Sequence, residues 1–176
     1  MFLWRLLTPS LVLTKSICGI TPRLMEQYGL KGLILDVDDT IVGSADIEVS
    51  EAVCEWVNSL KPLYPIWLVS NNFNQQRIQA IGDRLGLPYR SRASKPSLRV
   101  IRQVLAEMNL PPAQVAMVGD RLLTDIVAGN RAGMFSILIQ PVASAPPANL
   151  CAFLRVHTGL VRNWEIWLAR KSGIKI

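Results

Sequence analysis

The sequence predicts an α/β fold in which one parallel sheet carries helices on both of its faces. Short apolar runs of branched and aliphatic residues alternate along the chain with stretches whose apolar residues recur at helical spacing. The apolar runs are continuous rather than alternating, as expected of parallel strands that are buried on both faces. The connections are short, and 176 residues suffice for one domain of this kind.

Strands and helices are expected in strict alternation between residues 31 and 140. The strands are predicted at 33–35, 66–69, 115–118 and 135–139, with a short basic strand or loop at 89–92. The helices, which have apolar residues three and four positions apart, are predicted at 51–60, 74–85, 96–108 and from 124 to near 133. This alternation is typical of a sheet covered by helices on both sides.

Local signals mark where the helices begin and end. Ser50 can cap the first helix, and Pro96 suits the first turn of the third. Glycines follow the second helix at Gly86 and the fourth at Gly133. Near the N-terminus, Thr21 is predicted to cap a short helix that begins at the following proline.

The two ends of the chain differ from its centre in charge. Residues 1–30 form an apolar, weakly basic arm of net charge +2, residues 31–149 are neutral, and residues 150–176 predict an amphipathic helix of net charge +4. A proline-rich linker, 141–149, precedes that helix. Basic amphipathic segments bind anionic surfaces, so we expect the flanks to contact a membrane. The alternative that both flanks pack on the core stays open.

The remaining composition restricts the compartment and the partners. No apolar run approaches the roughly 18 residues of a spanning helix, and the N-terminus lacks the features of a signal peptide. Three widely spaced cysteines fit a reducing cytosol. We therefore expect a cytoplasmic protein, peripheral on the inner membrane face. The neutral centre has no basic groove with aromatic platforms, so no nucleic-acid partner is expected.

Polar side chains follow the predicted strands and would meet at one edge of the sheet. They are Asp36, Asp38 and Asp39 after the first strand, Ser70 and Asn71 after the second, Lys95 before the third helix, and Asp120 and Asp125 after the third strand. In an open parallel sheet, ligands bind outside the carboxyl ends of the strands. The cluster is therefore the candidate site.

These residue types suit phosphoryl transfer. A carboxylate such as Asp36 can act as a nucleophile and form an acyl-phosphate. Asp38 follows at period-two spacing, on the same side of an extended chain, where it could deliver a proton to the leaving oxygen. Lys95 and Ser70 could neutralise and hydrogen-bond phosphoryl oxygens. Mg²⁺, which prefers oxygen ligands, would offset the repulsion among the carboxylates.

Lys95 supplies a second argument for an anion site. It is predicted at the N-terminus of the helix at 96–108, where a cation opposes the helix dipole. A bound phosphate at that helix end would explain the lysine.

The ordered set of motifs resembles the haloacid dehalogenase (HAD) superfamily. Asp36-Val37-Asp38-Asp39-Thr40 is similar to its first motif, DxDxT, Ser70 to its second, Lys95 to its third, and Gly119-Asp120 with Asp125 to its fourth. The resemblance implies a three-layer, Rossmann-like parallel sheet. Further residues, including Ser70-Asn71-Asn72, Lys95-Pro96 and the run from Gly119 to Asp125, resemble the YqeG-like subfamily of capless HAD phosphatases.

The resemblance implies a role for each residue. Asp36 would be the nucleophile, Asp38 the general acid and base, and Ser70 and Lys95 phosphate binders. Asn71 and Asp39 are further candidates for phosphate binding, although helix capping is the favoured alternative for Asn71. Mg²⁺ would be held by Asp36, the backbone carbonyl of Asp38 and Asp120, with Asp125 supporting or ligating.

The motif spacing also bears on the substrate. Only 29 residues separate Thr40 from Ser70 and 24 separate Ser70 from Lys95, so neither interval holds a cap domain. An uncapped site favours a large or membrane-bound phosphorylated substrate. The YqeG-like group is similar to mitochondrial-type phosphatidylglycerophosphate phosphatases, which implies that lipid as substrate and phosphatidylglycerol as product. The alternatives are a phosphoprotein, a nucleic-acid end, or a membrane-associated interaction protein without turnover.

Overall fold

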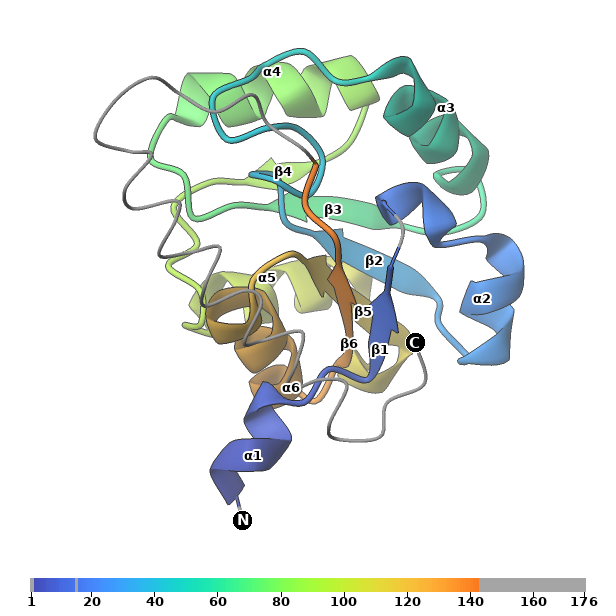
Figure 1. The fold of residues 1–176 in the computed structure, drawn as a ribbon, viewed down its shortest axis with the longest axis vertical. Helices are drawn as coiled ribbons and strands as arrows, with labels where there is room; N and C mark the ends of the chain where they lie inside the picture. The colour runs from blue at the N-terminus through green and yellow to red at the C-terminus, as the bar shows by residue number, and fades with distance from the viewer. Residues whose placement is uncertain (1, 15, 143–176) are drawn as a thin grey trace.

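The core is a six-stranded sheet in which every strand pair is parallel (Figure 1). A computed structural model describes residues 2–14 and 16–142, so the predicted C-terminal helix and nearly all of the predicted linker lie outside the described residues. The strand order is β1-β6-β5-β2-β3-β4. The strands are β1 (Leu11–Leu13), β2 (Gly32–Leu35), β3 (Ile66–Val69), β4 (Tyr89–Arg90), β5 (Val115–Gly119) and β6 (Phe135–Ile139).

Helices cover both faces of this sheet, which makes three layers (Figure 1). They are α1 (Phe2–Leu7), α2 (Pro22–Gln27), α3 (Glu51–Leu60), α4 (Gln75–Leu85), α5 (Arg99–Met108) and α6 (Val127–Ala132), with 3₁₀ turns η1 (Ile17–Gly19) and η2 (Pro112–Gln114) and a π-helical turn η3 (Leu122–Ile126). Within β2, Leu33 and Leu35 join the core under α2, α3 and α4, whereas Ile34 joins the core under α5 and α6. This alternation is that of a strand buried on both sides. The predicted fold class is confirmed.

The predicted helix boundaries agree with the structure at most positions. Thr21 caps α2 by accepting a hydrogen bond from the backbone N–H of Leu24 at 3.3 Å. Gly86 and Gly133 end α4 and α6 in the left-handed conformation that glycine adopts without strain. Ser50 occupies the N-cap of α3, but its hydroxyl makes no capping hydrogen bond, and only its carbonyl accepts bonds from the first turn.

The third predicted helix begins later than expected. Helix α5 starts at Arg99 rather than at Pro96, because residues 94–97 form a turn closed by the Ser97 N–H on the Ser94 carbonyl at 2.9 Å. Lys95 therefore lies in a turn four residues before α5. The prediction that Lys95 lies at a helix N-terminus is wrong. The helix dipole therefore does not support an anion site at this residue.

The N-terminal arm is part of the core over most of its described length. Strand β1, which the sequence did not predict, pairs with β6, and Ile17, Ile20 and Met25 are fully buried. The indole N–H of Trp56 donates to the Ile20 carbonyl at 2.7 Å. This part of the arm matches the alternative of packing on the sheet rather than that of a membrane anchor.

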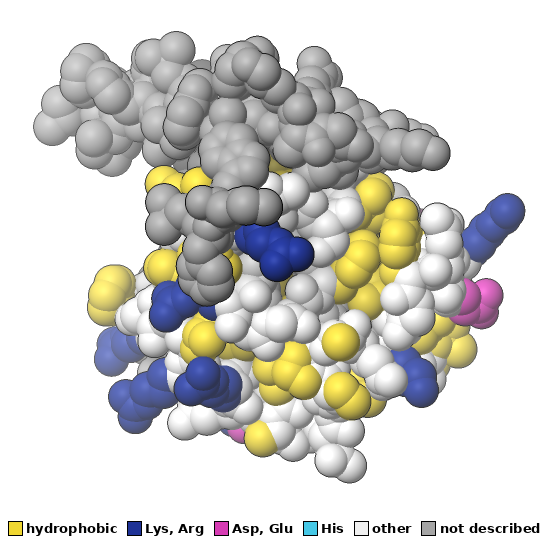
Figure 2. Space-filling view, turned by 90° about the horizontal axis from the view of Figure 1, so that it is seen from below, with side chains coloured by type: hydrophobic (Ala, Val, Ile, Leu, Met, Phe, Trp, Pro, Cys, Tyr) yellow, Lys and Arg dark blue, Asp and Glu magenta, His cyan; other side chains and the backbone are white. Residues whose placement is uncertain are grey.

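Basic side chains are unevenly distributed on the surface. On the face shown in Figure 2, hydrophobic side chains lie between polar ones and most Lys and Arg side chains gather on one side. None of the described helices combines the length and the apolar character that crossing a membrane requires.

Candidate active site

The predicted site residues meet at the carboxyl edge of the sheet because three neighbouring strands end level with one another. Leu35 of β2 pairs with Leu68 of β3 on one side and with Val118 of β5 on the other. The segments that follow β2 and β3 leave the sheet on the left of Figure 1. The structure therefore brings Asp36, Ser70 and Asp120 to adjacent strand ends.

Lys95 lies at the centre of this edge and joins two carboxylates. Its ammonium Nζ is 2.5 Å from Asp36 Oδ1 and 2.8 Å from Asp125 Oδ1, and it donates to the Val69 carbonyl at 2.8 Å. The ammonium thus makes two hydrogen bonds and a further ion pair. Lys95, Asp36 and Asp125 are all buried, so these charge-assisted bonds form out of contact with water.

Asn71 holds the backbone of Lys95 in place. Its side-chain Oδ1 accepts from the Lys95 N–H at 2.6 Å, and its Nδ2 donates to the Lys95 carbonyl at 3.0 Å. The segment after β3 thereby fixes the turn after β4, which explains why Lys95 reaches Asp36. Neither Asn71 nor Asn72 caps helix α4, because the cap is Asn74, which accepts from the Arg77 N–H.

Three buried carboxylates, Asp36, Asp120 and Asp125, each offer an oxygen within 4.8 Å of the others. Burial raises the pKa of Asp36 to about 7, with Lys95 lowering it and Asp125 raising it. Burial likewise raises the pKa of Asp120 to about 7, helped by repulsion from Asp36 and Asp125. Burial lowers the pKa of Lys95, but Asp125 and Asp36 raise it more, so it stays an ammonium.

This carboxylate group fits a hard divalent cation. The ligand atoms are all oxygens, which Mg²⁺ prefers, and a single ammonium faces carboxylates whose charges repel. A bound cation would add the positive charge that burial and repulsion make favourable. The residues present therefore fit the Mg²⁺ that the sequence predicts.

Asp38 has a separate set of partners. Its carboxylate accepts from the Ser70 hydroxyl at 3.1 Å and from Asn72 Nδ2 at 3.3 Å, and it forms an ion pair with Arg77 at 2.6 Å. It lies near enough to Asp36 to raise the pKa of that carboxyl slightly. Asp36 and Asp38 are thus neighbours with different surroundings, one facing an ammonium and the other a guanidinium and two neutral donors.

Arg77 and Asn72 were not predicted as site residues. The Arg77 guanidinium is buried and also donates to the backbone carbonyls of Asp46 and Gly43 at 2.9 Å each, so it ties Asp38 to the segment that follows it. The sequence contained a signal that Arg77 is buried and paired. Arg77 precedes the buried Ile81 by four residues, on the inward face of α4, and a buried cation requires a carboxylate partner.

Asp39 shapes the segment that follows β2 and shares Arg121 with Asp120. Its backbone has a φ of 61°, a left-handed conformation that aspartate tolerates. Its Oδ1 accepts from the Ser44 N–H at 3.1 Å, its Oδ2 lies 3.6 Å from Arg121, and its carbonyl accepts from the Val142 N–H at 2.8 Å.

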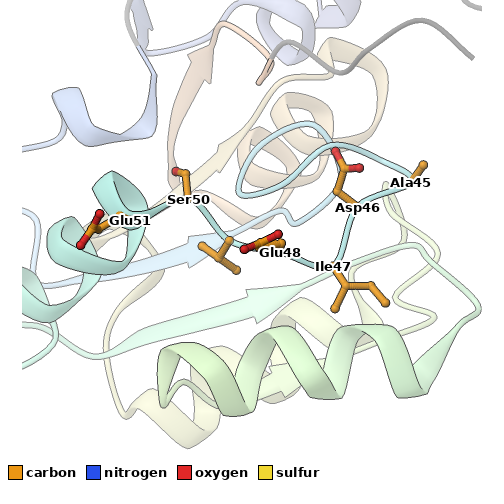
Figure 3. A pocket seen from close by; sticks show the side chains of 7 residues that line it. Ala45, Asp46, Ile47, Glu48, Ser50 and Glu51 are labelled. Carbon is orange, nitrogen blue, oxygen red and sulfur yellow. The ribbon is translucent and has the colours of Figure 1, made fainter.

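A shallow hollow of about 710 Å³ lies beside this segment and is lined by residues 45–51 alone. Figure 3 shows Asp46 and Ile47 projecting to opposite sides of the extended chain that leads into α3. None of the predicted site residues lines this hollow.

Gly119 allows Asp125 to approach the end of β5. A Cβ atom at residue 119 would lie 2.4 Å from the Asp125 carboxyl carbon, which is far inside van der Waals contact. Asp125 cannot easily yield, because its carboxylate is bonded to Lys95 and to the Arg121 N–H. Glycine is therefore required here for space rather than for a special φ.

We expect Gly119→Ala to lower phosphate release by about a hundredfold or more, because it displaces a carboxylate that positions Lys95. Hydrolysis of p-nitrophenyl phosphate measures the effect. Gly133→Ala adds no clash but strains a left-handed backbone away from the site, so it is the control for an effect of lost stability alone. Activity within about twofold of wild type for Gly119→Ala would contradict the steric argument.

Comparison with known proteins places this site among phosphatases. A family model described as HAD-hydrolase-like matches residues 92–144. The Bacillus subtilis protein named "Probable phosphatase YqeG" is 34% identical over 132 residues, which cover 74% of this chain and 76% of that protein.

Two further similarities are more distant. The chloroplastic phosphatidylglycerophosphate phosphatase 1 of Chlamydomonas reinhardtii is 29% identical over 164 residues, which cover 88% of this chain but only 58% of that longer protein. The crystal structure of a haloacid dehalogenase-like family hydrolase from Xanthomonas campestris superposes with a TM-score of 0.50 at 12% identity, over 81% of this chain and 95% of that one. The structural match supports the fold.

Proposed function

The chain belongs to the YqeG group of HAD-like phosphatases, and from that premise we propose that it hydrolyses phosphatidylglycerophosphate to phosphatidylglycerol through a phosphorylated Asp36. The observation on which the proposal rests most is the Asp36–Lys95–Asp125 group, buried at the carboxyl edge of the sheet, with Asp38 beside it on other partners. This arrangement separates a nucleophile from a proton donor.

In the first step, an Asp36 carboxylate oxygen attacks the phosphorus atom and forms an acyl-phosphate as the bond from phosphorus to the lipid oxygen breaks. Asp38, in its protonated form, gives its proton to the departing oxygen. Lys95 holds Asp36 in position and stabilises negative charge on the phosphoryl group. Ser70 donates its hydroxyl proton to Asp38 and would donate it to a phosphoryl oxygen instead when the substrate binds.

In the second step, water attacks the phosphorus atom of the acyl-phosphate. Asp38, now a carboxylate, takes a proton from that water, and the bond between phosphorus and Asp36 breaks. Inorganic phosphate leaves, and Asp36 and Asp38 return to their starting forms. Arg77 keeps Asp38 aimed at the site throughout.

Mg²⁺ would be held by Asp36, Asp120 and the carbonyl of Asp38, with Asp125 behind them, and would supply positive charge that offsets repulsion between the nucleophile and the phosphate. Asn71 and Asp39 are proposed here as backbone-positioning residues, because their side chains are bonded to the Lys95 and Ser44 backbones.

The access to the site supports a lipid substrate. The chain between Thr40 and Ser70 contains only α3 and β3 as helix and strand, and the chain between Ser70 and Lys95 contains only α4 and β4. Neither interval therefore contains an additional domain that could cover Asp36. Such a site does not enclose a small metabolite. The similarity to the algal phosphatidylglycerophosphate phosphatase, over 88% of this chain, agrees with this choice.

The test is a comparison of substrates for one enzyme preparation with Mg²⁺. We expect phosphatidylglycerophosphate in mixed micelles to be hydrolysed with a kcat/KM at least about tenfold above that of a phosphopeptide, a 5′-phosphorylated oligonucleotide and sugar phosphates. The product, phosphatidylglycerol, is identified by mass spectrometry. Equal or greater activity on one of the other three would assign the protein to that substrate class instead.

A further inference from the structure

Exposed hydrophobic side chains are unevenly placed on this molecule. Among the described residues, the large hydrophobic side chains exposed to solvent are Tyr28, Ile47, Leu63, Phe73 and Leu123. Tyr28 and Leu63 precede β2 and β3, so they lie toward the amino edge of the sheet. The other three follow β2, β3 and β5 and lie at the carboxyl edge, where the catalytic group is.

Phe73 and Leu123 follow the two strands that flank the strand before Asp36. Phe73 is 75% exposed and follows β3, and Leu123 is 57% exposed and follows β5. Asp36 follows β2, the strand between them. Since neighbouring strands are about 4.8 Å apart, the two flanking strand ends are roughly 10 Å apart. A headgroup phosphate that reaches the buried Asp36 therefore enters between the two segments that carry these apolar side chains.

Basic side chains accompany both of them. Arg92 is exposed after β4, and it is tied to the segment carrying Phe73 by its N–H on the Asn72 carbonyl at 3.2 Å and its Nε on the Phe73 carbonyl at 3.4 Å. Arg121, whose side chain is 55% exposed, lies two residues before Leu123. Each apolar residue thus has an arginine close to it in the fold or in the chain, as at protein surfaces that bind anionic lipid headgroups. Arg121 also lies 3.6 Å from Asp39 and 3.9 Å from Asp120, but more than half of its side chain is in solvent.

The third apolar residue, Ile47, has different neighbours. Exposed Asp46 and Glu48 flank it, and both would be repelled by an anionic surface. The charge pattern therefore selects the side of the site that holds Phe73 and Leu123 and leaves the segment from Ala45 to Glu51 (Figure 3) away from it.

We propose that Phe73, Arg92, Arg121 and Leu123 form a lipid-contacting rim through which the protein docks on an anionic phospholipid bilayer, with Asp36 directed at the headgroups. The inference rests on the lipid substrate proposed above. It places the membrane contact on loops of the catalytic core. Insertion of the two apolar side chains at the headgroup boundary adds to binding in proportion to the apolar area buried. Arg92 and Arg121 contribute attraction to anionic headgroups.

The experiment uses the full chain and a double variant, Phe73→Ser with Leu123→Ser. The substrate is phosphatidylglycerophosphate in vesicles of phosphatidylcholine and phosphatidylglycerol, and p-nitrophenyl phosphate is the soluble comparator. We expect activity on vesicles to fall by about tenfold or more. Activity on the soluble ester should stay within about twofold, because both side chains are exposed and apolar and make none of the hydrogen bonds or ion pairs of the catalytic group.

Leu63→Ser is the matched control, since Leu63 is 60% exposed but lies toward the opposite edge of the sheet. It should leave both activities unchanged. Co-sedimentation with substrate-free vesicles of the same composition measures docking separately from turnover. If wild type hydrolyses no lipid, the proposed substrate is wrong, and co-sedimentation alone tests whether the rim binds lipid. Equal vesicle binding by wild type and the double variant, or an equal loss of activity on both substrates, would contradict the proposed rim.

Discussion

Asp36→Asn should abolish phosphate release, by at least about a thousandfold, while the protein remains folded. The amide cannot form the acyl-phosphate. The neighbouring carboxylates have other partners, because Asp125 is bonded to Lys95 and the Arg121 N–H, Asp120 is paired with Arg121, and Asp38 with Arg77. Since Asp36 adds a repelling charge to a buried group, its neutral replacement should leave the free energy of unfolding unchanged or higher in metal-free buffer at pH 8. Urea denaturation and phosphate release provide the two measurements.

Asp83→Asn is the control for the Asp36 variant. Asp83 is exposed on α4 and lies far along the helix from the site, so the same chemical change there should affect neither quantity. Turnover by the Asp36 variant above about one per cent of wild type would show that Asp36 is not the nucleophile. Trapping of radiolabelled phosphate on the wild-type chain but not on the variant would support the covalent intermediate directly.

Lys95→Met should impair both activity and stability. The methionine fills much of the lysine volume but leaves Asp36 and Asp125 buried without their shared ammonium. Removing one partner from a buried charge group costs about 3–5 kcal/mol, and loss of the charge that faces the phosphoryl group should lower kcat by about a hundredfold or more. Lys31→Met, at an exposed lysine, is the matched control.

The stability loss in Lys95→Met should depend on pH, in a direction set by the carboxyls. Burial raises the pKa values of Asp36 and Asp120 to about 7, well above those of unfolded aspartates, so the folded protein binds more protons than the unfolded chain between about pH 4 and pH 7. Stability that depends on these groups therefore falls as pH rises across that interval. Without Lys95, which lowers the pKa of Asp36, that pKa should rise further, so the fall should continue to higher pH. A loss that is equal at pH 5 and pH 8, measured in EDTA, would contradict this account.

Strands β2, β3, β5 and β6, and the polar side chains that follow β2, β3 and β5, could be predicted from the hydrophobic pattern because parallel, fully buried strands have continuous apolar runs. Strand β1 did not follow from it. Its three residues lie within a longer apolar arm, and its partner β6 is more than a hundred residues away, so nothing local distinguishes pairing in the sheet from packing against it.

The hydrogen bonds and ion pairs that join the segments of the site were harder to predict than the residues that meet there. The two bonds from Asn71 to the Lys95 backbone and the ion pair from Arg77 to Asp38 join segments 24 and 39 residues apart. Such contacts are tertiary and leave no periodic signal. The same bonds explain the late start of α5, because Asn71 holds the Lys95 backbone in a turn and Pro96 alone does not begin a helix.

Strand β1 covers the edge of β6 and leaves an edge strand of only three residues in its place. An unpaired strand edge is a template for another chain, and β6 would be that edge if β1 were absent. The arm is secured to the core by Asn130, whose Nδ2 donates to the carbonyls of Leu6 and Thr8 at 2.9 Å each, and whose Oδ1 accepts from the Ser136 hydroxyl at 2.7 Å. The residues before Ile17 therefore act as a covering strand, and a shortened chain that lacks them would expose the hydrogen-bonding edge of β6 to its neighbours.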